Sequence, residues 1–338
     1  MTYQTLAGVF AALLLAGSAS SPAWAQDIQT NPAASEKGSL SILFENDIFY
    51  NSDHDYTNGV GLAYTTAPGG TPDWMVRTAR AIPFFAQTGD VRARFELGQS
   101  MFTPHDLSLA NPPATDRPYA GFLYGALGLV DDTGTGLDQL QVSLGMVGPA
   151  SLAEEAQKFI HSTFNDRKPL GWSTQLRDEP GLVIEYNRSI KLIAPQSILG
   201  AVFDVEPNYG AAIGNVYDYA EIGTMARLGF NLPKDYGPMR IEPSLPGSDY
   251  FEPTAGLGAY LFLGVDGRAI ARNLFLDGNS FQPSRSVDKL NLVGDLVLGA
   301  AVTFDSVRLS FTHDIRTREY KTQPAADQFG AVDLTFRF

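Results

Sequence analysis

Short stretches of the chain alternate apolar and polar residues with a period of two, which is the pattern of β-strands with two different faces. The last strand-like stretch shows it most clearly, with apolar or small residues at 330, 332, 334, 336 and 338 and mainly polar residues between them. In a soluble sandwich the polar face would meet water. In an outer-membrane barrel the apolar face contacts lipid and the polar face lines the lumen. The aromatic residue at the end of the chain, Phe338, favours the membrane barrel.

The alternation predicts an all-β fold, a transmembrane antiparallel β-barrel of about 12 strands with a short helix in an extracellular loop. The expected strands are 39–50, 56–66, 91–101, 119–130, 138–147, 181–193, 198–210, 217–230, 255–266, 287–304, 306–318 and 327–338. An even number of strands places both ends of the barrel on the periplasmic side. Residues 39–338 are therefore predicted to form one barrel domain.

The N-terminal region reads as an export signal. An apolar stretch from Leu6 to Ala16 precedes small residues that end at Ala25. This stretch is shorter than the ~20 apolar residues that a spanning helix needs, although no Lys or Arg precedes it. We expect residues 1–25 to be a signal peptide and 26–38 an N-terminal periplasmic segment.

With a periplasmic N-terminus, alternate connections lie at the cell surface: 51–55, 102–118, 148–180, 211–216, 267–286 and 319–326. The connection 148–180 is predicted to contain a helix over 152–164, because the run lacks Gly and Pro and follows a Ser151–Glu154 capping box. Gln157 and His161 would share one face of this helix. Two periplasmic connections, 67–90 and 231–254, are unusually long, and the first is expected to hold a short helix over 73–82.

Composition removes several classes of function. The chain has 24 Lys+Arg against 37 Asp+Glu, a formal net charge of −13, so it lacks the basic footprint that a nucleic-acid partner requires. The absence of cysteine excludes disulfides, Cys-ligated metals and thiol catalysis.

Polar motifs concentrate at the outer ends of the predicted strands and follow one another in a fixed order. They are Glu45-Asn46-Asp47, Tyr56-Thr57-Asn58-Gly59, Gly98-Gln99 with Thr103-Pro104, Asp116-Arg117-Pro118-Tyr119-Ala120-Gly121, Val147-Gly148-Pro149, Gln157-x-x-x-His161, and Gly171-Trp172 with Gln175. In this order the motifs resemble those of the outer-membrane lipid A 3′-O-deacylase (LpxR) family, over nearly the whole chain after the leader.

The resemblance implies a calcium-dependent esterase that removes the 3′-linked acyloxyacyl chains from lipid A, a component of lipopolysaccharide, in the outer leaflet. It implies site roles for Asn46, Asp47, Thr57, Gln157 and His161. The family's extra basic residues before the fourth strand are replaced here by Leu109-Ala110-Asn111-Pro112-Pro113. Recognition of phosphate would then fall to Arg117, Arg167 or Lys168.

The chemistry of these residue types agrees with ester hydrolysis, which needs a base to activate water and donors for the developing oxyanion. His161 is the best candidate for the base, because the unperturbed pKa of histidine lies near neutrality. Alternation points Asp47 into the lumen, where it could bind a hard cation such as Ca²⁺, and Asn46 outward unless a bulge re-aims it. Thr57 shares the parity of the residues predicted to line the lumen.

Three alternatives remain open at this point. A phospholipase-like esterase would use Thr57 as a nucleophile with His54, although three-residue spacing places these two on opposite faces of a regular strand. A passive channel or a surface adhesin would need the barrel alone, and neither explains the helix-bearing loop and the polar rim.

Overall fold

The computed structural model describes residues 37–47, 55–164, 169–198, 200–241, 243–244, 246–254 and 256–338. The predicted signal peptide, most of the predicted periplasmic segment, and the candidate residues His54, Arg167 and Lys168 lie outside these ranges.

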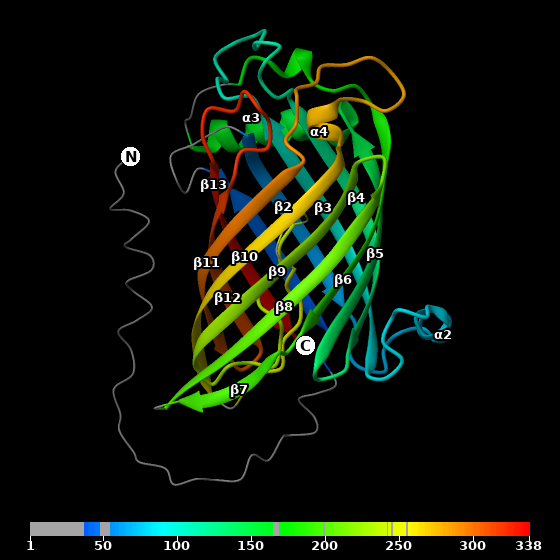
Figure 1. Ribbon diagram of the computed structural model, residues 1–338, viewed down its shortest axis with the longest axis vertical. Helices are drawn as coiled ribbons and strands as arrows, with labels where there is room; N and C mark the ends of the chain where they lie inside the picture. The colour runs from blue at the N-terminus through cyan, green and yellow to red at the C-terminus, as the bar shows by residue number, and fades with distance from the viewer. Residues whose placement is uncertain are drawn as a thin grey trace. The chain divides into compact units, whose positions relative to one another are not determined.

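The described residues form one continuous antiparallel sheet (Figure 1). Its strands are β1 (Ser39–Asn46), β2 (Asp55–Thr65), β3 (Asp90–Thr103), β4 (Ala120–Asp132), β5 (Gly136–Val147), β6 (Glu179–Ile190), β7 (Ile193–Ile198), β8 (Ala201–Gly214), β9 (Tyr217–Phe230), β10 (Leu257–Asn273), β11 (Leu292–Phe304), β12 (Val307–Arg316) and β13 (Asp327–Arg337). Pairing of β1 with β13 and of β6 with β8 closes the sheet into a barrel. Strand β7 pairs with β8 alone in the described chain.

The predicted fold is confirmed: a closed 12-strand barrel with one extra strand. The stretch after residue 266 continues β10 as far as Asn273, and the short strand β7 was not predicted. Its residues are all exposed, so β7 lacks the one-sided burial that makes alternation visible in a sequence.

The helices are α2 (Asp73–Ala81), α3 (Ala153–Phe164) and the short α4 (Leu274–Asp277), with 3₁₀ turns at Pro149–Ser151 and Trp172–Thr174. The two helices predicted from the sequence are confirmed, but the expected capping box at Ser151 is wrong. The Ser151 hydroxyl donates to the Gly148 carbonyl oxygen at 2.6 Å and so belongs to the preceding 3₁₀ turn. No helix in these described ranges is long and apolar enough to cross a membrane.

The outer face of the barrel carries a band of exposed apolar side chains, as the alternation predicts. Along β10, for example, Leu261, Leu263 and Val265 are exposed, and the residues between them are buried. Such a band is the lipid-contacting surface of an outer-membrane barrel.

The lumen is filled rather than open. The described part of the second long connection, residues 231–241, 243–244 and 246–254, enters the barrel, and we call it the lumen segment. Arg240 of this segment donates to Glu45 at 3.0 Å and to Asp314 at 2.6 Å. Arg94 of β3 donates to Asp249 of the segment at 2.7 Å. These buried ion pairs bind the lumen segment to the barrel wall on several sides.

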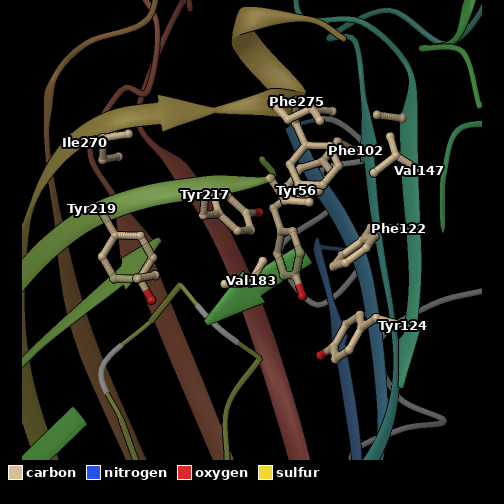
Figure 2. Packing of buried hydrophobic residues seen from close by; sticks show 14 of the residues in the cluster. Tyr56, Phe102, Phe122, Tyr124, Val147, Val183, Tyr217, Tyr219, Ile270 and Phe275 are labelled. Atoms are coloured by element: carbon tan, nitrogen blue, oxygen red, sulfur yellow. The ribbon is translucent and has the colours of Figure 1, made fainter. Parts of the chain in front are cut away.

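Aromatic rings fill the lumen beyond the lumen segment, towards the end where β2 begins. Figure 2 shows rings from β2, β3, β4, β9 and α4 converging inside the wall. Tyr56 lies 5.5 Å from Phe102 between ring centroids, and Phe102 stacks on Phe275 at 4.3 Å. A cavity of about 60 Å³ separates this cluster from the lumen segment and is lined by both.

Candidate active site

The first part of the site lies at the end of the β1–β2 hairpin. Asn46, the last residue of β1, pairs with Asn58 of β2, and the Asn58 amide donates to the Glu45 carbonyl oxygen at 3.1 Å. Asn46 and Asp47 are both buried. The hairpin therefore brings the first two polar motifs together, as the sequence predicted. Glu45 points inward, as its parity predicted, and accepts from the Tyr56 hydroxyl at 2.7 Å.

A β-bulge at Thr57 corrects the predicted direction of this side chain. The register of β2 against β3 shifts between Tyr56 and Asn58, so Thr57 is the extra residue. The Tyr56 ring belongs to the aromatic cluster that fills the lumen. The Thr57 hydroxyl instead forms a 2.7 Å hydrogen bond with the Thr103 hydroxyl. Thr103 follows Phe102 on β3, and successive side chains of a strand point to opposite faces. Because Phe102 points into the lumen, Thr103 points outward. Thr57 therefore lies on the outer face of the wall, not in the lumen.

Helix α3 packs against this same outer face. Its residue Ala153 clusters with Met101, Tyr119 and Trp172, and Figure 1 shows the helix at the end of the barrel where β2 begins. Gly121 of β4 permits this contact: a Cβ there would lie 2.3 Å from the Cβ of Ala153 and 2.2 Å from the Ser151 hydroxyl. A glycine in the fourth-strand motif is thus required for the helix to dock.

The buried stripe of α3 is Ala153, Gln157 and His161, spaced four residues apart. Its first residue makes the apolar contact with the wall, and the next two are polar. The Gln157 side-chain oxygen accepts from the Trp172 indole at 2.7 Å, which fixes the amide. Gln157 and His161 therefore share one face, as predicted, and that face is turned towards the protein, since their side chains are only 2% and 6% exposed.

Arg117 lies in a buried ion-pair network at the rim beside the bulge. Its guanidinium donates to Glu319 at 3.0 Å, lies 3.7 Å from Asp55, and stacks 4.7 Å from the Phe102 ring centroid. Burial acts to lower the pKa of Arg117, but the Glu319 and Asp55 carboxylates raise the pKa overall. The side chain is 0% exposed, so a phosphate would contact it only after a rearrangement of the rim. The role predicted for Arg117 in phosphate recognition stays a prediction.

Two further members of this network, Glu319 and Tyr320, were not predicted from the sequence. Glu319 and Tyr320 precede β13, and the Tyr320 hydroxyl donates to Asp116 at 2.8 Å and lies 3.3 Å from Asp55. These two contacts link residues 204 and 265 positions apart, and Arg117 and Glu319 are 202 positions apart. No local pattern in the sequence marks them.

A calcium ion bound at Asp47 would have few carboxylate ligands from the protein. Within the described ranges no group of three or more His, Asp or Glu side chains is arranged to hold a metal. Asp47 offers one buried carboxylate directly after β1. Because Ca²⁺ accepts carbonyl, amide and water oxygens as well as carboxylates, this donor set fits calcium better than a metal that needs several side-chain ligands.

Together these features define an outer-membrane β-barrel with a polar site enclosed between its outer wall and a surface helix. The chain matches the family described as outer membrane protein LpxR over residues 9–338. It belongs to this family, and is accordingly a protein of the bacterial outer membrane. Membership supports an outer-membrane lipid A deacylase.

A solved structure of LpxR has the same fold. LpxR from Salmonella typhimurium superimposes with a TM-score of 0.72 at 22% identity, covering 89% of this chain and 100% of that one. The β-domain of the Bordetella autotransporter BrkA reaches a TM-score of 0.42 at 10% identity, covering 90% of this chain and 99% of that one. No curated protein matches the sequence.

Proposed function

We propose that the protein is a calcium-dependent ester hydrolase that removes the 3′-linked acyloxyacyl chains of lipid A in the outer leaflet. The observation that carries the proposal is the position of the polar site on the lipid-facing side of the wall, under α3. A membrane lipid can approach such a site sideways without leaving the bilayer. A lumen site would require the whole lipid to enter the barrel.

The filled lumen disfavours the channel alternative. Arg308 donates to Asp235 at 2.6 Å and to the Ser248 carbonyl oxygen at 2.6 Å, which ties the lumen segment to β12. With buried ion pairs of this kind along its length, the lumen segment cannot leave without exposing unpaired charges. A permanently filled barrel serves a surface reaction better than passive transport.

In the proposed reaction His161 takes a proton from a water molecule, and the water oxygen attacks the ester carbonyl carbon. The Asn46 amide and the Thr57 hydroxyl would donate hydrogen bonds to the oxyanion, and Gln157 would orient the reacting groups. The carbon–oxygen ester bond then breaks, and the proton on His161 passes to the departing sugar oxygen. The products are the acyloxyacyl acid and a free 3′-hydroxyl.

Asp47 would hold calcium, which when bound would polarise the ester carbonyl as a Lewis acid. Arg167 and Lys168 follow α3 in the sequence and remain candidates for binding a lipid A phosphate. Arg117 would contribute mainly by fixing the rim beside Thr57, since its guanidinium is already engaged by carboxylates.

The test is turnover of lipid A in ¹⁸O-labelled water. Direct attack by water places ¹⁸O in the released acid and leaves no acyl group on the protein. His161→Ala should reduce release by about 10²- to 10⁴-fold, the usual contribution of a general base, and the barrel should keep its heat-resistant mobility on gels. An acyl adduct on Thr57, or loss of activity in His54→Ala with full activity in His161→Ala, would replace this proposal with the phospholipase-like mechanism.

A further inference from the structure

A second concave surface lies on the lipid-facing side of β9, β10 and β11, near the end of the barrel that carries α3. Its volume is about 770 Å³, which is within the ~300–1,000 Å³ range of ligand pockets. We call it the β10 groove. The residues of β10 that form its floor are Gly267 and Ala269, both exposed in a strand whose alternate residues are buried.

The register of the strands explains why the wall is hollow here. Gly267 lies between Ile222 of β9 and Gly294 of β11, and Ala269 lies between Ala220 and Leu292. In both of these cross-strand rows, the central residue on β10 therefore has a small side chain or none. Ile222 and Leu292, which are 71% and 75% exposed, stand at its two edges.

One exposed cation lies at the rim edge of the groove, whereas its other arginine, Arg268, is buried. Arg318 lines the groove directly after β12 and is exposed. Among the described residues it forms no hydrogen bond or ion pair. The nearby rim acid Asp288 is already 3.4 Å from Lys321. An apolar groove with a free guanidinium at the membrane surface matches the two parts of a lipid, an acyl chain and an anionic headgroup.

We propose that the β10 groove binds an acyl chain of a phosphate-bearing lipid of the outer leaflet, with the lipid phosphate paired to Arg318. This lipid is not the one in the candidate active site. Around the barrel β10 stands opposite β3, with β2, β1, β13, β12 and β11 between them on one side and β4, β5, β6, β8 and β9 on the other. The proposal therefore does not depend on the proposed enzymatic function.

The groove can be filled without disturbing the wall. A Cβ at Gly267 would have the Ile222 carbonyl oxygen, 4.0 Å away, as its sole neighbour, so Gly267→Leu adds an apolar side chain into open space. Gly125 of β4 is a matched control, because it is also exposed and a Cβ there meets only the Glu96 carbonyl oxygen at 3.9 Å. Arg318→Gln removes the charge and keeps a polar side chain.

The experiment is native mass spectrometry of the detergent-solubilised protein titrated with bis-phosphorylated lipid A, in a His161→Ala background that slows turnover. We expect Gly267→Leu to bind one lipid fewer, Arg318→Gln to weaken that binding step at least tenfold, and Gly125→Leu to bind as the parent does. Dephosphorylated lipid A should bind the parent and Arg318→Gln equally at this step.

Unchanged lipid binding in both groove variants would overturn the proposal. A dimer of the parent that disappears in Gly267→Leu would also overturn it, since the groove would then be an interface between two copies of the chain. Heat-resistant mobility of each variant on gels verifies that the barrel has assembled. Ester release by Gly267→Leu with His161 intact reports separately on the proposed enzymatic function.

Discussion

Substitution of Gly121 by alanine tests whether docking of α3 on the barrel wall sets the catalytic geometry. The new Cβ would lie 2.3 Å from the Cβ of Ala153, whereas two carbon atoms in contact stand about 3.5–4.0 Å apart. Ala153 has no side-chain torsion that could relieve this clash. The first turn of α3 must therefore move outward by roughly 1.2 Å or more, and His161, two turns further along the same buried stripe, moves with it.

A displacement of about 1 Å in a catalytic group can cost about 10²-fold in rate, which corresponds to roughly 2.7 kcal/mol of transition-state stabilisation. We therefore expect Gly121→Ala to lower kcat/KM for lipid A about 10²-fold while the barrel still assembles. Gly125→Ala is the control, because it places the same methyl group on the same strand in open space. The assay is mass-spectrometric detection of released acid with heat-modifiable mobility as the folding readout. Activity of Gly121→Ala within threefold of the parent would refute the argument.

Three further predictions address the metal, the aromatic support of the site and the topology. Asp47→Ala should abolish activity and Asp47→Asn should raise the calcium concentration needed for it, whereas full activity of the parent in excess chelator would remove calcium from the mechanism. Trp172→Phe should lower kcat about tenfold, because it removes the indole hydrogen bond that fixes the Gln157 amide, an interaction of ~0.5–1.5 kcal/mol; an unchanged kcat would show that this hydrogen bond does not position Gln157. Leu170→Cys, on a 54% exposed side chain in a chain without native cysteine, should react with an impermeant maleimide on intact cells, and labelling only after the outer membrane is broken would reverse the orientation.

The barrel could be predicted from the sequence because each strand has one apolar and one polar face, and this alternation is a local property. The loop helix was predictable for a similar reason, since a run without Gly or Pro sits between glycine-rich strand ends. Strand β7 could not be predicted in this way, because neither of its faces is buried.

The direction of Thr57 could not be predicted, because a single extra residue in β2 reverses the alternation on which the prediction relied. The partners of Arg117 could not be predicted for another reason. Glu319 meets Arg117 only after the sheet has closed between β1 and β13. The filling of the lumen by the lumen segment likewise depends on ion pairs with distant strands, so the sequence showed only an unusually long connection.

The most direct test of the account is to incubate the purified protein with lipid A in calcium, with His161→Ala and Gly125→Ala alongside, and to follow the products by mass spectrometry. We expect the protein and Gly125→Ala to release the 3′-linked acyloxyacyl acid and leave a free 3′-hydroxyl, and His161→Ala to release at most about one hundredth as much. Intact lipid A after prolonged incubation with the folded protein, or equal release by His161→Ala, would contradict this account.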